Sequence, residues 1–339
     1  SASQDQNRHD DDRNDEQHQP RQLARGQQHQ DQATDENQQV AQRDRNRRAQ
    51  NRLYQGRISG NPAQHFAGHD LFEELRAHPD HTVKDRAADV NAMFADKSVK
   101  AVMAVRGGWG CARILPYLDY DLIRANPKPL IGYSDITALH LALQAKAGLV
   151  SFHGPNASSK WGKRTLEYFK PLSFDGAKPT FANPILDDDR LVQRKWRTQT
   201  LTGGKASGHL IGGNLTVLSA LVGTPYMPST DGAILFLEDV DEAEYRIDRM
   251  LTQLGQAGLL SGLKGVVFGQ CTSCSTSGGS GFELADILAH HLKSLGIPAF
   301  HGAFFGHIAD QFTVPVGVNA EIARCRNETC KQVRRNCQG

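Results

Sequence analysis

The stretch Pro129-Leu130-Ile131-Gly132-Tyr133-Ser134-Asp135-Ile136-Thr137 decides the fold of this chain. Residues 130–132 predict a short buried strand, a tight turn follows, and residues 135–147 predict a helix with apolar side chains on one face. Ser134 therefore lies at a strand–turn–helix junction, where its hydroxyl can face the carboxyl end of a sheet. Open α/β folds bind their ligands at that end.

The alternation of strands and helices continues on both sides of this stretch. A helix is predicted at 85–95, and strands are predicted at 100–105 and 149–152. The pattern weakens between 158 and 205, where prolines interrupt it. A second series follows, with strands near 209–211, 233–237, 265–269 and 298–303 and helices near 214–222, 243–257 and 282–295. Such alternation predicts an α/β fold with mostly parallel sheets.

Changes in composition divide the chain into segments. Residues 1–52 are mostly Gln, Asp, Arg, Asn and His, and Leu23 and Val40 are their only large aliphatic residues. Such a segment buries too little apolar surface to offset its ordering entropy. We expect a disordered tail at 1–52, an N-terminal α/β domain with the nucleophile at 53–165, an interdomain region at 166–205, a C-terminal β/α domain at 206–323 and an irregular, disordered tail at 324–339.

Charge and composition limit the classes of function. The net charge of +2 argues against a nucleic-acid partner. No stretch approaches the ~20 apolar residues that span a bilayer, and the N-terminus lacks the apolar core of a secretory signal. The six cysteines are sparse for a disulfide scaffold. We therefore expect a cytoplasmic protein with reduced cysteines and no membrane partner.

Ser134 is the candidate nucleophile. The backbone N–H of Asp135 would point from a helix N-terminus, which favours an oxyanion. The glycine-rich turn at 107–110 also follows a strand, so it could lie beside Ser134 and offer a second N–H. Two simpler interpretations stay open: Ser134 is only a helix cap, and the glycines only allow a tight turn.

A serine hydroxyl needs a base to take its proton. His307 follows a strand-like segment and is the candidate base, and Glu238 ends the apolar run 234–237 and could orient the imidazole. A surface histidine and a solvated acid at the start of a loop are the alternatives. His153, His140 and His209 are rival histidines with equally plausible structural roles.

Several motifs in this order resemble the LD-carboxypeptidase family of serine peptidases. The resemblance runs from about Asp85 to Val318. The matching motifs are Arg106-Gly107-Gly108-Trp109-Gly110, Leu115-Pro116-Tyr117-Leu118-Asp119-Tyr120-Asp121, Ile131-Gly132-Tyr133-Ser134-Asp135, Phe152-His153-Gly154-Pro155, Gly212-Gly213-Asn214-Leu215, Phe236-Leu237-Glu238-Asp239 and Gly306-His307 with Gln311.

The resemblance implies a fold, an activity and a site. The fold would be an N-terminal flavodoxin-like layer and a C-terminal β/α domain, in a homodimer without metal or cofactor. The activity would be the release of the terminal D-alanine from murein tetrapeptides in cell-wall recycling. The site residues would be a catalytic triad of Ser134, Glu238 and His307, an oxyanion hole of the Gly108 and Asp135 backbones, and candidate substrate contacts at Gly107, Trp109 and Asn214.

Both ends of the chain depart from the family pattern. The family's first strand is replaced by the polar tract and its last strands by the Cys- and Arg-rich tail. One hypothesis is that both ends are translated out of frame.

Three other functions stay open. A microcin C self-immunity hydrolase of peptidyl or aminoacyl sulfamoyl adenylates would stack the nucleobase on Trp109 or Trp161. A non-catalytic peptide-binding α/β protein would use Ser134 only as a cap. A zinc protein would use Cys271 and Cys274 together with cysteines of the tail.

Overall fold

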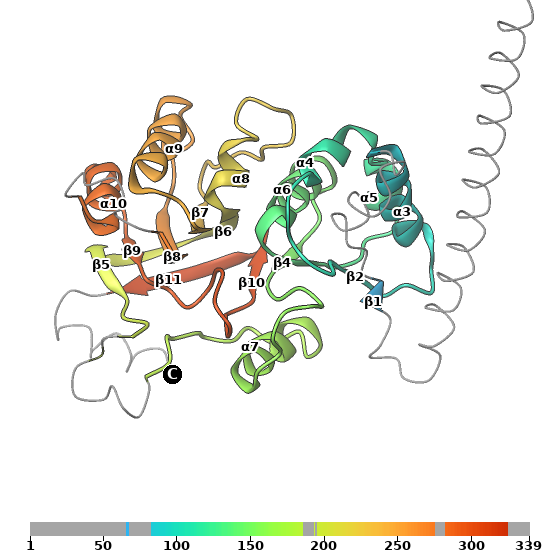
Figure 1. The fold of residues 1–339 in the computed structure, drawn as a ribbon, viewed down its shortest axis with the longest axis horizontal. Coiled ribbons are helices and arrows are strands. Elements are labelled where there is room, and N and C mark those ends of the chain that lie inside the picture. The colour runs from blue at the N-terminus through green and yellow to red at the C-terminus, as the bar shows by residue number, and fades with distance from the viewer. Residues whose placement is uncertain (1–65, 68–82, 186–192, 194, 275–281, 325–339) are drawn as a thin grey trace, which may run out of the picture. The chain divides into compact units, whose positions relative to one another are not determined.

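The computed structural model describes residues 66–67, 83–185, 193, 195–274 and 282–324. The segments predicted as disordered tails, and the out-of-frame hypothesis about them, lie outside these residues except for Arg324. The described residues form two β-sheets with helices, so the predicted α/β fold class is confirmed (Figure 1).

The first sheet carries the stretch around Ser134. Its strands are parallel except for the last, which runs antiparallel to its neighbour. In spatial order the strands are β1 (Phe66–Ala67), β2 (Ala101–Met103), β3 (Leu130–Gly132), β4 (Ser151–His153) and β10 (Val314–Val316). The strand predicted at 130–132 therefore lies at the centre of this sheet, and β10 is an edge strand that the sequence did not predict.

Helices cover both faces of the first sheet. Those before and after β3 are α3 (Val83–Ala95), α4 (Cys111–Ile114), α5 (Tyr120–Ala125) and α6 (Thr137–Ala147), with short 3₁₀ turns η1 (Leu115–Tyr117) and η2 (Ser134–Ile136). Side chains alternate along β3, so Leu130 packs with these helices and Ile131 faces the other way. Ile131 packs there against Phe169 of α7 (Lys163–Ser173).

The second sheet is parallel at its centre and has an antiparallel strand at each edge. Figure 1 shows its helices α8 (Leu215–Ser219), α9 (Glu244–Gln256) and α10 (Leu284–Leu292) gathered on one face, and the 3₁₀ turn η4 (Lys293–Leu295) follows α10. In spatial order the strands are β11 (Asn319–Arg324), β6 (Gly204–Asn214), β7 (Ile234–Val240), β8 (Gly265–Thr272), β9 (Ala299–His301) and β5 (Gln199–Thr202).

The two sheets share one apolar core. Ile136 and Leu139, next to the candidate nucleophile, belong to the same buried cluster as Ile211 of β6. The contact is close because Gly213 has no side chain: a Cβ there would lie 2.4 Å from Oγ1 of Thr137. This packing places the turn after β3 beside the carboxyl ends of the second sheet's strands.

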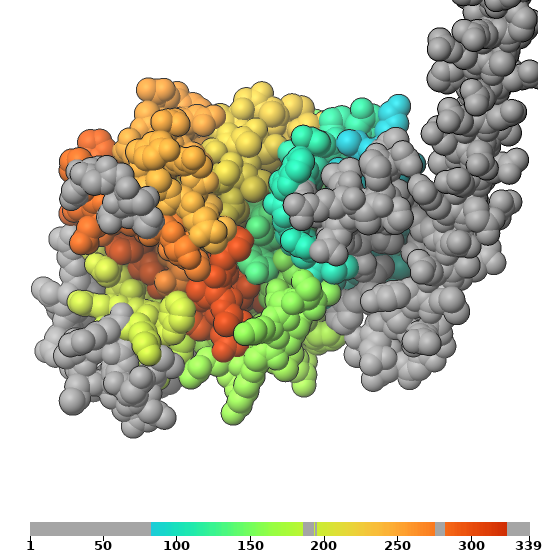
Figure 2. All heavy atoms as spheres, in the orientation of Figure 1, coloured from blue at the N-terminus to red at the C-terminus, as the bar shows by residue number. Residues whose placement is uncertain are grey.

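The predicted interdomain region at 166–205, where the sequence pattern weakens, contains regular structure. Helix α7 and strand β5 fall wholly or partly within it. Pro171 was interpreted as a helix breaker, but it lies inside α7, in its last turn. The proline removes only the bond that an N–H at this position would donate to the Glu167 carbonyl, and the helix ends two residues later at Ser173. Thr165 and Phe169 anchor the helix because both are buried, and Figure 2 shows α7 (green) beside the red C-terminal segment. The predicted domain boundaries stay a prediction.

Among the described residues, no helix is both long and apolar enough to cross a membrane.

Candidate active site

The turn that carries Ser134 has an unusual backbone. Ser134 has a φ of 67°, in the left-handed region that residues other than glycine rarely adopt. Strand β3 ends at Gly132, and the backbone N–H of Tyr133 donates to Oδ1 of Asn156 at 3.2 Å. Such strain persists only where the surroundings hold it, and it is common at functional sites. The half-buried Ser134 side chain is thus raised on a sharp strand-to-helix turn, as the sequence predicted.

The glycine-rich turn after β2 lies directly against Ser134. A Cβ on Gly107 would be 2.7 Å from Cβ and 2.9 Å from Oγ of Ser134, closer than real Cβ contacts allow. Glycine is therefore required there for the backbone to approach the hydroxyl. The predicted neighbourhood of the two backbone segments is confirmed, while the oxyanion role of Gly108 and Asp135 stays a prediction.

His307 and Glu238 form a hydrogen-bonded pair although 69 residues separate them. Nδ1 of His307 donates to Oε2 of Glu238 at 2.7 Å, and the Glu238 side chain is fully buried in β7. Gly306 permits the approach, because a Cβ there would lie 3.0 Å from that oxygen. The His307 ring contacts the Tyr133 ring, with centroids 4.9 Å apart. Through Tyr133 the pair lies beside the turn that carries Ser134.

The surroundings of His307 favour its cationic form. Burial lowers the pKa of His307, but the hydrogen bond and the negative charge of Glu238, together with Asp239 and Asp241, outweigh burial and raise the pKa above its ordinary value. An imidazole that has taken a proton is therefore stabilised at this position.

The rival histidines lie in positions that are typical of histidines with a structural role. His140 contacts the Gly132 carbonyl through Nε2 at 2.9 Å and the Ser151 hydroxyl through Nδ1 at 2.8 Å, and burial lowers its pKa to about 4. His153 is fully buried against aromatic rings, and burial holds its pKa well below the ordinary value. His209 lies within strand β6, where it pairs with Asn319.

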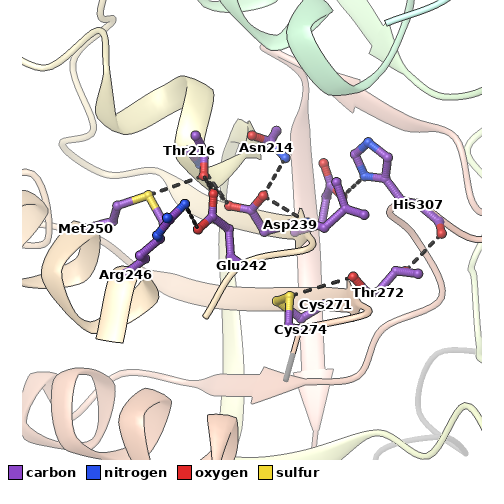
Figure 3. The surroundings of a disulfide bond; sticks show 12 residues. Asn214, Thr216, Asp239, Glu242, Arg246, Met250, Cys271, Thr272, Cys274 and His307 are labelled. Atoms are coloured by element: carbon purple, nitrogen blue, oxygen red, sulfur yellow. Dashed lines mark hydrogen bonds and ion pairs between the residues drawn. A yellow bond between two sulfur atoms is a disulfide. The ribbon is translucent and has the colours of Figure 1, made fainter. Parts of the chain in front are cut away.

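Asp239, next to Glu238, belongs to a separate polar network (Figure 3). Its carboxylate accepts hydrogen bonds from Nδ2 of Asn214 and from the backbone N–H and hydroxyl of Thr216, each at 2.9 Å. Burial raises the pKa of Asp239 to about 6. Because β7 alternates its side chains, the two adjacent acids have different partners. Asp239 was not among the residues predicted for the site.

The predicted substrate contacts differ in how exposed they are. The Asn214 side chain is buried, bonds Asp239 and caps α8 by accepting the Val217 N–H at 3.0 Å. Trp109 is 55% exposed, with the Arg113 guanidinium 5.0 Å from its ring centroid. Trp161 packs against Phe169. A substrate contact stays a prediction for Asn214, Trp109 and Gly107.

The expectation of reduced cysteines is wrong for one pair. Cys271 and Cys274 form a disulfide at the end of β8, and between them the Thr272 hydroxyl donates to the His307 carbonyl at 2.9 Å (Figure 3). Bonded to each other, the two sulfurs are not available to zinc. In the part of the chain that the structure describes, no three His, Cys, Asp or Glu residues cluster as metal ligands. The Cys-x-x-Cys spacing was the signal that predicted this proximity.

Family models match both halves of the chain. The LD-carboxypeptidase N-terminal domain matches residues 39–154, and the LD-carboxypeptidase C-terminal domain matches residues 207–322. The chain belongs to the LD-carboxypeptidase family. The N-terminal match begins well before Asp85, where the motif resemblance began.

LD-carboxypeptidase relatives of two kinds are similar to this chain. A probable murein peptide carboxypeptidase of Bacillus subtilis is 38% identical over 241 residues, covering 70% of this chain and 73% of the relative. The microcin C7 self-immunity protein MccF of Escherichia coli is 29% identical over 266 residues, covering 71% and 76%.

The similar solved structures of LD-carboxypeptidase relatives are also of these two kinds. An MccF-like protein from Bacillus anthracis has a TM-score of 0.62 at 32% identity, covering 72% of this chain and 79% of the other. A muramoyltetrapeptide carboxypeptidase from Oxalobacter formigenes has a TM-score of 0.60 at 31% identity, covering 72% and 80%.

Proposed function

We propose that this member of the LD-carboxypeptidase family is a serine carboxypeptidase that hydrolyses the L,D-peptide bond before the terminal D-alanine of murein tetrapeptides. The observation that carries the proposal is the 2.7 Å bond between His307 and buried Glu238, beside the strained turn of Ser134. A cytoplasmic, homodimeric enzyme of cell-wall recycling is part of the same proposal.

The mechanism follows from these groups. His307 accepts the Ser134 proton as the hydroxyl oxygen attacks the scissile carbonyl carbon. Glu238 holds the imidazole orientation and stabilises the imidazolium. The N–H groups of Gly108 and Asp135 stabilise the oxyanion by ~3 kcal/mol each. His307 then protonates the leaving D-alanine, and a water molecule activated by the same imidazole hydrolyses the acyl-enzyme.

The test is the release of D-alanine from a murein tetrapeptide. Wild-type protein should release it, and Ser134→Ala should lower kcat by about 10⁴-fold or more. Ser219→Ala is the matched control, because Ser219 is a buried serine whose hydroxyl donates to a backbone carbonyl in α8. Wild-type protein without activity, or an active Ser134→Ala variant, would contradict the proposal.

A second candidate is the hydrolysis of aminoacyl sulfamoyl adenylates. The similarity to MccF and the exposed Trp109 beside Arg113 favour it, because an exposed indole can stack on a nucleobase. A comparison of kcat/KM for the tetrapeptide and for an aspartyl sulfamoyl adenosine separates the two. A peptide-binding protein would instead bind the tetrapeptide equally well with and without the Ser134 hydroxyl and release nothing.

A further inference from the structure

The Asp135 side chain contacts the turn on which the oxyanion hole depends. Its backbone N–H is a proposed oxyanion donor, whereas its carboxylate bonds a different segment, and the residue is only 7% exposed. Oδ2 of Asp135 accepts the backbone N–H of Cys111 at 2.8 Å, across 24 residues of sequence. Cys111 is the first residue of α4 and directly follows the glycine-rich turn at 107–110.

The bond from Cys111 to Asp135 provides a hydrogen-bond acceptor that the residue before α4 lacks. Gly110 is the residue before α4, with a φ of 107°, and it has no side chain to cap the helix. The first N–H groups of a helix lack partners within the helix, and a carboxylate is a favourable acceptor for them. Asp135 supplies this acceptor from a different segment, so the cap also links two segments.

A buried positive charge lies behind the same turn. The Arg86 side chain is 1% exposed, and a Cβ on Gly110 would lie 3.6 Å from one guanidinium nitrogen and 3.8 Å from the other. Burial is the main reason why the pKa of Cys111 is raised; the negative charge of Asp135 adds to it, and Arg86 opposes it. Asp135 and Arg86 are therefore both buried residues whose charges act on Cys111, at the end of the glycine-rich turn.

The glycine-rich turn is thus fixed at both ends to the segment that carries the nucleophile. At one end Gly107 lies against the Ser134 side chain, and at the other Cys111 is bonded to Asp135. We propose that the Asp135 carboxylate is a positioning residue that holds the turn at 107–110 against Ser134, so that the Gly108 and Asp135 N–H groups converge on one oxyanion. This inference rests on the proposed function.

The test compares Asp135→Ala with Asp135→Asn in D-alanine release. Alanine removes the acceptor, whereas asparagine keeps an oxygen that can accept the Cys111 N–H. We expect Asp135→Ala to lower kcat by about 10²- to 10³-fold with KM within about threefold, as for the loss of an oxyanion donor. Asp135→Asn should recover at least about tenfold of that loss.

Asp119→Ala is the matched control. The Asp119 carboxylate accepts the Leu122 N–H at 2.9 Å and caps α5, so its removal also costs one capping bond, away from the turn. It should lower the melting temperature without changing kcat. A similar fall of kcat in Asp119→Ala, or equal kcat for the alanine and asparagine variants of Asp135, would overturn the proposal.

Hydrogen exchange tests the same link without a substrate. Asp135→Ala should speed amide exchange in the segment 107–112 at least about tenfold relative to the central strands of the second sheet, whereas Asp119→Ala should not. Unchanged exchange there overturns the positioning role. Faster exchange in a protein that cleaves no L,D-peptide bond would support the link and reject the proposed function.

Discussion

The turn that carries Ser134 and the hydrogen-bonded pair of His307 and Glu238 position their functional groups in different ways. Ser134 is held by backbone geometry: a φ of 67°, a glycine pressed against it and backbone hydrogen bonds on neighbouring residues. His307 and Glu238 are held by charge, with a carboxylate buried completely and bonded to one imidazole. Changes to the first region should therefore act through shape, and changes to the second through protonation.

Among changes that leave the Ser134 hydroxyl in place, Glu238→Gln should have the largest effect on kcat; it keeps the shape of the side chain and removes its charge. We expect kcat for D-alanine release to fall by about 10³- to 10⁴-fold, since a neutral amide no longer stabilises the imidazolium. The folded protein should remain, as judged by its melting curve. A kcat within tenfold of wild type would show that the negative charge of Glu238 contributes little to catalysis.

The pH profile of the same variant sharpens the comparison. His307 acts as a base only when neutral, so its raised pKa puts the acidic limb of kcat/KM above the ordinary value for histidine. The charge of Glu238 is one of the causes that raise this pKa, so its removal should lower the pKa and move the limb to lower pH. A limb that stays in place would assign it to a different group.

Gly107→Ala should have the next largest effect, and it should act through shape. The added methyl would lie 2.7 Å from Cβ of Ser134, so the turn or the serine must move. We expect kcat to fall about 10²- to 10³-fold with the acidic limb of the profile unchanged, because no charge near His307 changes. A shifted limb would mean that the two regions are coupled. Gly148→Ala is a control for lost stability: its Cβ meets no atom within 4 Å, but its φ of 64° makes alanine strained there, so it should lower stability and leave kcat unchanged.

The sequence predicted the first region better than the second for a physical reason. The strand, turn and helix around Ser134 are contiguous, and local residue types decide them. The bond between His307 and Glu238 depends on how two segments separated by tens of residues come together in the fold. The sequence alone could therefore only identify a loop histidine and an acid at the end of a strand. The resemblance to the family, rather than the local sequence pattern, assigned His307 and Glu238 to the same site.

Other errors have the same origin. Helix α7 was missed because a proline was weighed locally, whereas burial of Phe169 against Ile131 is a tertiary effect. Edge strands β10 and β11 were missed because their antiparallel partners, β4 and β6, lie far away in the sequence. The role of Asp239 was not predicted because nothing in the neighbouring sequence shows that Asn214 and Thr216 would bond its carboxylate.

Asp239→Asn should reveal the cost of a second buried acid beside Glu238. A folded-state pKa of about 6 exceeds the reference value of 3.8, so the folded protein binds the proton more tightly. The stability this provides is complete below pH 3.8 and is lost as pH rises through 6, by up to about 3 kcal/mol. Asparagine does not titrate. The free energy of unfolding of wild type minus that of the variant, from urea titrations, should therefore fall between pH 4 and 7, and a constant difference would contradict the argument.

The smallest expected effect is the difference in stability between Ser134→Gly and Ser134→Ala, and it tests strain directly. At a φ of 67° a residue with a Cβ is strained, whereas glycine adopts this conformation readily. Ser134→Gly and Ser134→Ala both lose the hydroxyl, so both should be inactive, but only alanine keeps the strain. We expect the glycine variant to be more stable than the alanine variant by about 0.5–1 kcal/mol in urea unfolding, net of the greater entropy of glycine in the unfolded chain. If the alanine variant proves the more stable, the turn is not strained. In that case the neighbouring glycine and hydrogen bonds do not have to offset any strain at Ser134.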